Sequence, residues 1–200
     1  FASNAVGLAY GRDTWIADRL AAGDPWYEVV RDASAGDVAI SDPALDPLGY
    51  RAVLAFRLAA REHGLDDFAA STLERVYQEP EEPQLLAGVE TGNRAAAVAY
   101  RNMAVAHDLP FEPFPAAYNF ADPNRTETYA SVSYTTTDGY TVTGAPIVYN
   151  ATVLADAAAP TAGRRFVRFL AGATDVLREN GLTVAAFPRA HGAVPTEVLS

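Results

Sequence analysis

The 200-residue chain has no cysteine, no lysine and no long hydrophobic run. Without cysteine it cannot form disulfides, thiolate metal sites or a cysteine nucleophile. No apolar stretch approaches the ~20 consecutive residues that a helix needs to cross a bilayer. A hydrophobic core must therefore stabilise the fold, and half of the residues are hydrophobic, which is sufficient to form one.

The missing lysines leave arginine as the basic residue at all fifteen positions, against 25 Asp and Glu, so the net charge is −10. An acidic surface is a poor match for nucleic acid or for an anionic membrane surface. An acidic, lysine-free chain is typical of a protein from a high-salt organism. A GC-rich genome would also replace lysine by arginine, and we favour the first explanation. High salt would also screen the repulsion of an anionic ligand, because the Debye length is about 3 Å at 1 M.

The chain also lacks the short motifs of common catalytic and nucleotide-binding sites. It contains no G-x-G-x-x-G, no G-x-x-x-x-G-K and no G-x-S-x-G. His63, His107 and His191 stand alone without the spacing of metal ligands, and we expect them at the surface or at helix ends. The sequence therefore predicts no catalytic constellation, no free metal cation and no cofactor.

Strands and helices alternate along the chain, which indicates an α/β fold of one large domain or two small lobes. Proline near 110–115 predicts an edge strand there, and Asp138-Gly139 between alternating residues predicts a hairpin. Expected helices are 13–22, 25–33, 47–63, 65–77, 84–91 and 161–180, with a helical turn at 103–107. Expected strands are 1–9, 37–41, 95–100, 109–114, 129–134, 140–143, 146–154 and 183–187.

The most informative stretch is residues 41–51, where two Asp-Pro dipeptides precede a long amphipathic run. Asp46 is predicted to be the N-cap of a helix and Pro47 its first residue. The N–H groups of Leu48, Gly49 and Tyr50 would then be unpaired at the positive end of the helix dipole, which favours an anion. An ordinary capped helix is the alternative.

Four segments, residues 1–10, 41–51, 99–107 and 142–149, together resemble the substrate-binding protein of archaeal tungstate/molybdate ABC transporters. The order and spacing match across nearly the whole chain. The resemblance implies a type II periplasmic-binding fold, in which two α/β lobes joined by crossover strands clamp one oxyanion. Family members begin well before Phe1, so it also implies an incomplete first lobe. The expected organisation is a crossover strand at 1–7, the second lobe at 8–128 and a return to the first lobe at 129–200.

The resemblance also implies the site residues. The expected oxyanion-binding set is Asp46, the N–H of Leu48, Ala99, Tyr100 and the Tyr149 hydroxyl, with Asp42, Gly49 and Ser3 as further candidates. Ala99 departs from the family, because archaeal members that hold the metal six-coordinate have a Glu there. Either hydrogen bonds hold a tetrahedral oxyanion here, or the ligand differs.

The implied ligand is tungstate or molybdate, and the implied partner is the membrane permease of an ABC importer. We expect an extracellular protein, anchored to the outer face of the cell membrane through a segment before Phe1, monomeric at full length and not an enzyme. One alternative is a small α/β enzyme with Asp42 or Asp46 as general base. The other is a ligand-sensing domain of a regulator.

Overall fold

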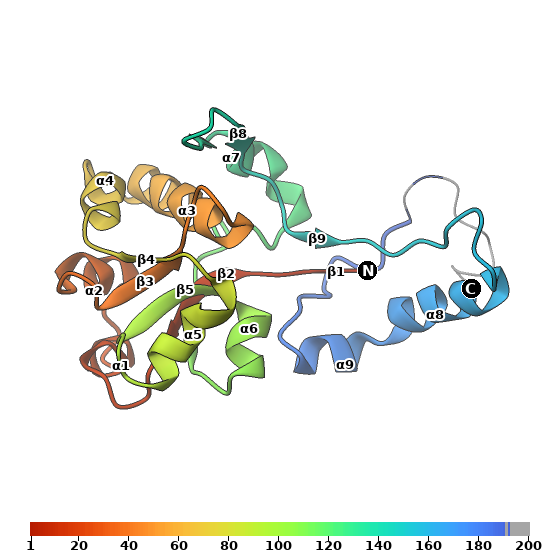
Figure 1. Ribbon diagram of the computed structural model, residues 1–200, viewed down its shortest axis with the longest axis horizontal. Helices are drawn as coiled ribbons and strands as arrows, with labels where there is room; N and C mark the ends of the chain where they lie inside the picture. Colours follow the sequence, from red (N-terminus) through yellow and green to blue (C-terminus); the bar gives the residue numbers. More distant parts are fainter. Residues whose placement is uncertain (191, 193–200) are drawn as a thin grey trace.

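The computed structural model describes residues 1–190 and 192, and a five-stranded mixed sheet organises its larger part (Figure 1). The strand order is β4-β3-β5-β2-β6. Strand β3 is parallel to β4 and β5, whereas β2 is antiparallel to β5 and β6. The strands are β2 (Val6–Tyr10), β3 (Val38–Ser41), β4 (Tyr77–Glu79), β5 (Ala96–Tyr100) and β6 (Phe111–Pro113).

Helices pack on both faces of this sheet, which is why its central strands are almost wholly apolar. Side chains alternate along β2, so Val6 and Leu8 join the larger core while Ala9 joins the smaller core on the other face. The helices of this part are α1 (Trp15–Ala21), α2 (Trp26–Asp32), α3 (Pro47–His63), α4 (Phe68–Leu73), α5 (Glu82–Glu90) and α6 (Arg101–Ala106).

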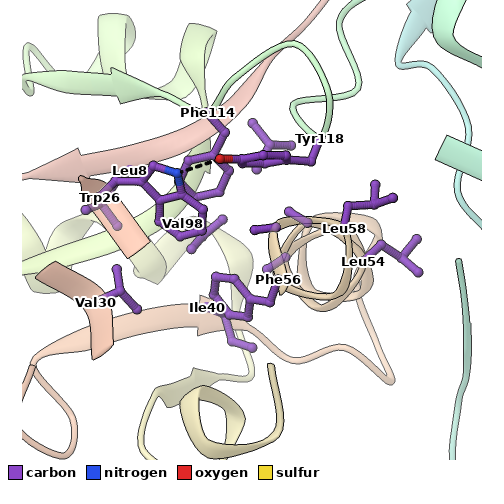
Figure 2. Packing of buried hydrophobic residues seen from close by; sticks show 14 of the residues in the cluster. Leu8, Trp26, Val30, Ile40, Leu54, Phe56, Leu58, Val98, Phe114 and Tyr118 are labelled. Carbon is purple, nitrogen blue, oxygen red and sulfur yellow. Dashed lines mark hydrogen bonds between the residues drawn. The ribbon is translucent and has the colours of Figure 1, made fainter. Parts of the chain in front are cut away.

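Trp26 lies at the centre of the larger core (Figure 2). Its ring stacks on Phe114 with the centroids 4.0 Å apart, and Phe56 of α3 packs at 6.3 Å. Its indole Nε1 donates to the hydroxyl of buried Tyr118 at 3.1 Å. That phenol also lies 3.1 Å from Nε2 of His63 at the end of α3. The polar atoms of Trp26 and Tyr118 are thus paired.

The rest of the chain forms a smaller part, of which Phe120, Tyr129 and Val132 pack into the larger core whereas residues 160–179 extend away from it (Figure 1). Strand β1 (Ala2–Ser3) pairs antiparallel with β9 (Val148–Tyr149), and only two residues separate β1 from β2 of the large sheet. Helices α8 and α9 lie at the opposite end of the molecule from α1 and α2 (Figure 1). The remaining elements are a 3₁₀ turn (Pro123–Arg125), α7 (Thr126–Ala130), the hairpin strands β7 (Ser133–Thr135) and β8 (Thr141–Thr143), α8 (Pro160–Gly172) and α9 (Thr174–Glu179).

Several predicted elements are confirmed. Helix α3 begins and ends where the sequence predicted, with Asp46 as N-cap and Gly64 in the left-handed region at φ 62°. Strand β6 lies at the sheet edge, and the hairpin around Gly139 forms. His63 and His107 lie at helix ends, while His191 is outside the described residues.

Other predictions were wrong at element boundaries. The expected helix 65–77 is helical only at Phe68–Leu73, because residues 77–79 pair with β3 as an edge strand and tertiary pairing outweighs local propensity. The expected helix 161–180 breaks at Ala173, next to Gly172, a weak helix former.

In the smaller part, less strand forms than the sequence predicted. Residues 129–130 belong to α7, and only Val148–Tyr149 of the run 146–154 pairs, since β1 offers just two residues. Residues 183–187 make a single bridge, between Thr183 and Ser3. Within the described part of the chain, no helix is both long enough and apolar enough to span a bilayer.

Candidate functional site

The turn between β3 and α3 is built by Asp42. Its Oδ1 accepts from the Ala44 N–H at 2.8 Å, and its carbonyl accepts from the Asp46 N–H at 3.0 Å. Its own N–H donates to the Glu79 carbonyl at the end of β4. The Asp42 carboxylate therefore holds the loop that delivers Asp46 to the start of α3.

Asp46 caps α3 with its own side chain. Its Oδ1 accepts from the N–H of Leu48 at 2.5 Å and from the N–H of Gly49 at 3.2 Å. The prediction that these N–H groups are open donors was wrong, because the cap already occupies them. An anion at Leu48 would have to replace, or share, the Asp46 carboxylate.

Gly49 allows α3 to start directly against the end of β3. A Cβ at this position would lie 2.4 Å from the Ser41 carbonyl oxygen and 2.6 Å from the Asp42 carbonyl. Both neighbours are backbone, so neither can turn aside as a side chain would. The role of Gly49 in the structure is thus close packing.

Arg51, one turn further along α3, joins this helix to the end of β5. Its Nη1 donates to the Tyr100 hydroxyl at 2.5 Å, and its guanidinium lies 5.4 and 5.8 Å from the ring centres of Tyr50 and Tyr100. Burial raises the pKa of Tyr100 to about 12, so the phenol keeps its proton at neutral pH. Ala99, the preceding residue, is fully buried opposite Gly7 and presents no polar side chain.

Glu82 is a site residue that we did not predict from the sequence. The Glu82 carboxyl hydrogen-bonds Asp46, and this bond, burial and the Asp46 charge raise its pKa to about 7, against the opposing effect of Arg51. The signal that could have found it is the parallel pairing of β3 and β4, because parallel strands bring their carboxyl ends to one edge of the sheet.

Tyr149 contacts the link between the two sheets. Asn4, which is fully buried, donates through Nδ2 to the Tyr149 hydroxyl at 3.0 Å and to Asn102 Oδ1 at 2.6 Å. Asn102 lies in the first turn of α6, two residues after Tyr100. The structure thus joins the segments of Tyr100 and Tyr149, both predicted from the sequence, through two asparagines that the sequence analysis did not single out.

Ser3 is turned inward. Its hydroxyl donates to the Ala121 carbonyl at 2.7 Å, and its backbone pairs with Thr183. The single hydroxyl proton is therefore engaged inside the protein. Within residues 1–190 and 192, no three His, Asp or Glu side chains gather in a way that could hold a metal ion.

Relatives of known sequence match almost the whole chain. An uncharacterized solute-binding protein of Halobacterium salinarum is 53% identical over 98% of this chain and 63% of its own length. A putative ABC transporter molybdenum-binding protein of Haloferax volcanii is 41% identical over the same shares. The molybdate/tungstate-binding protein WtpA of Pyrococcus abyssi is 30% identical over 99% of this chain and 65% of its own length. The chain thus spans less than two thirds of these relatives, and the two haloarchaeal sources agree with the arginine-only, acidic composition.

A solved structure has the same fold. The substrate binding domain of a putative molybdenum ABC transporter from Clostridium difficile matches with a TM-score of 0.55, over 91% of this chain and 64% of that chain. At 14% identity this likeness shows the α/β, periplasmic-binding-like fold alone.

The family model of bacterial extracellular solute-binding proteins matches residues 1–183. Proteins of this kind bind a solute for transport rather than transform it, which confirms the expectation of a binding protein and not an enzyme. The extent of this match and the identity of the relatives lead to one conclusion: the chain belongs to the bacterial extracellular solute-binding protein family.

Proposed function

We propose that the full protein captures a metal oxyanion, molybdate or tungstate, for an ABC importer. The observation that carries the proposal is a pair of tyrosines whose hydroxyl oxygens already accept a hydrogen bond. Tyr100 accepts from Arg51 and Tyr149 accepts from Asn4. In the described part of the chain no acceptor takes either phenol proton, so both can be donated to a ligand. The printed names of two relatives support the ligand class.

The chemistry of this set suits a dehydrated dianion. The Tyr100 phenol stays protonated because its pKa is about 12, and Arg51 beside it supplies a permanent positive charge. Hydrogen bonds to a charged partner are the strong ones, and they satisfy an anion that has lost its water. Because Ala99 cannot ligate, hydrogen bonds rather than a pair of carboxylates hold the oxyanion. The proposed lining is Asp46, Leu48, Ala99, Tyr100 and Tyr149, with Asp42, Gly49 and Ser3 shaping the backbone around it.

The proposal includes the arrangement of the whole protein. Residues 8–128 form the second lobe, residues 1–7 a crossover strand and residues 129–200 the return to a first lobe, and the ligand lies between the lobes. The loaded protein then docks on a membrane permease outside the cell. We further propose that it is monomeric and anchored to the outer face of the membrane.

A general base at Asp42 or Asp46 is the weaker alternative. Both carboxylates accept backbone N–H groups that hold the β3–α3 turn together. Within the described residues neither has a histidine beside it, and the one titratable group beside Asp46 is Glu82, whose contact with Asp46 raises its pKa.

Calorimetric titration of the full-length protein with molybdate, tungstate and sulfate tests the proposal. We expect the two metal oxyanions to bind more tightly than sulfate. Tyr100→Phe and Tyr149→Phe should each weaken binding by about tenfold to a hundredfold, the cost of one hydrogen bond to a charged ligand. Tyr140→Phe is the matched control, because Tyr140 is 68% exposed.

Two results would contradict the proposal. Equal affinity for sulfate would leave a general anion binder and remove the metal-oxyanion class. No binding of any of the three anions would remove the proposed function altogether.

A further inference from the structure

The side chain of Asn4 has a fully determined orientation. It is 0% exposed and lies in the two-residue link between β1 and β2. Its Oδ1 accepts from the Ala5 N–H at 3.0 Å, and a backbone N–H can only donate, so the oxygen must face it. Both protons of Nδ2 then face the two remaining partners, Asn102 Oδ1 at 2.6 Å and the Tyr149 hydroxyl at 3.0 Å.

This orientation decides what the two partners can do. An amide nitrogen cannot accept a hydrogen bond, so the Tyr149 oxygen is the acceptor and its proton must point elsewhere. For the same reason Asn102 turns its oxygen to Asn4 and its own Nδ2 protons away. In residues 1–190 and 192 no acceptor takes the Tyr149 proton or the Asn102 amide protons. Both oxygens lie within hydrogen-bond distance of one nitrogen, so the two groups that carry the free protons are neighbours.

We propose that Asn102 is a further oxyanion-binding residue and that Asn4 is the positioning residue, whose buried amide turns the Asn102 and Tyr149 protons toward the ligand. The inference rests on the proposed function and deepens it. These two residues offer the ligand protons and no acceptor, so this side of the site selects an oxyanion that carries no proton of its own, such as molybdate or tungstate.

The substitution Asn4→Asp reverses the network with little change in size. The new carboxylate has no proton to donate, so Tyr149 and Asn102 would turn their protons inward to it. The ligand then loses two donors, each of which contributes about tenfold or more in affinity when the partner is charged. We expect molybdate and tungstate affinity of the full-length protein to fall by about 100-fold or more.

Asn119→Asp is the matched control. Asn119 is also a structural asparagine, which donates to the Phe114 carbonyl and accepts from the Ala121 N–H, and it does not contact this network. The same amide-to-carboxyl change there should lower thermal stability but leave oxyanion affinity within about twofold of the wild type.

A double-mutant cycle separates positioning from simple loss of structure. If Asn4 acts through Tyr149, the effects of Asn4→Ala and Tyr149→Phe should not be independent. The fold-loss of affinity in the double variant should then be smaller than the product of the fold-losses in the two single variants. If Asn4→Asp does not fold, Asn102→Asp and the uncharged Asn102→Ala test the same donors at a half-buried position, and both should weaken binding.

The outcomes distinguish the inference from the proposed function. The inference is overturned if the wild-type protein binds molybdate and tungstate and Asn4→Asp, or both Asn102 variants, bind them equally well. The proposed function would then still stand. Strictly multiplicative losses in the cycle overturn the positioning role. A wild-type protein that binds neither oxyanion overturns both.

Discussion

Substituting Gly49 by alanine tests whether close packing fixes the start of α3. The new Cβ would lie 2.4 Å from the Ser41 carbonyl oxygen, and real contacts of this kind stop near 3.0 Å, so the helix start must move by at least about 0.6 Å. Such overpacking costs about 3 kcal/mol at the upper end of its usual range. Alanine returns about 1 kcal/mol through its better helix propensity. We therefore expect a net loss of about 2 kcal/mol in the free energy of unfolding.

The measurement is a urea titration followed by circular dichroism, with thermal unfolding as a second readout. A loss of about 2 kcal/mol corresponds to a fall of roughly 4–8 °C in Tm for a chain of this size. Oxyanion affinity should fall as well, because the movement carries Asp46 and Leu48 with it.

Gly88→Ala in α5 is the control, for which we expect a change in stability of the opposite sign. There the new Cβ would meet only Cγ of Arg94, at 3.2 Å, and this half-buried side chain has to shift by only a few tenths of an ångström. Helix propensity then dominates, and stability should rise by up to about 1 kcal/mol. A Gly49→Ala variant as stable as the wild type would refute the reasoning, since it would show that the β3–α3 turn yields easily.

Two further predictions concern the core and the acidic pair. Tyr118→Phe leaves the buried Trp26 indole N–H without its acceptor, so the free energy of unfolding should drop by about 1–3 kcal/mol, whereas the exposed Tyr140→Phe should change nothing; chemical denaturation measures both. Folding raises the pKa of Glu82 from 4.5 to about 7, so the folded state binds this proton more tightly than the unfolded state. The contribution to the free energy of unfolding is fully present below pH 4.5 and is lost as the pH rises through 7. Thermal unfolding at several pH values should show this decline, and Glu82→Gln should flatten it; an unchanged slope in that variant would disprove the assignment.

The features that could be predicted from the sequence are those that neighbouring residues determine. Helix α3 was predicted to the residue because Asp46, Pro47 and Gly64 mark its two ends through local backbone chemistry. The N-cap prediction for Asp46 already implied that its carboxylate would accept from the N–H of Leu48 or Gly49. The expectation that these groups would be open was therefore inconsistent with it.

The parts that escaped prediction depend on contacts between distant segments. Asn4 meets Asn102 across 98 positions and Tyr149 across 145 positions of sequence, so no periodicity connects them. Glu82 has its raised pKa because the fold brings it beside Asp46, which lies 36 positions earlier in the sequence. A polar residue acquires such a role only when the topology supplies its partner.

The attachment of the β7–β8 hairpin to α3 has a practical consequence. Arg57 and Arg61 on the second half of α3 donate to the carbonyls of Ser133 and Ser131. The hairpin is therefore attached to a 17-residue helix that is about 25 Å long and begins at the candidate site. Any tilt of α3 moves the hairpin with it. Because the chain has no cysteine, the exposed hairpin position 137 can take a lone thiol through Thr137→Cys. A dye attached there would report movement of α3 optically, at a distance from the ligand and without touching it.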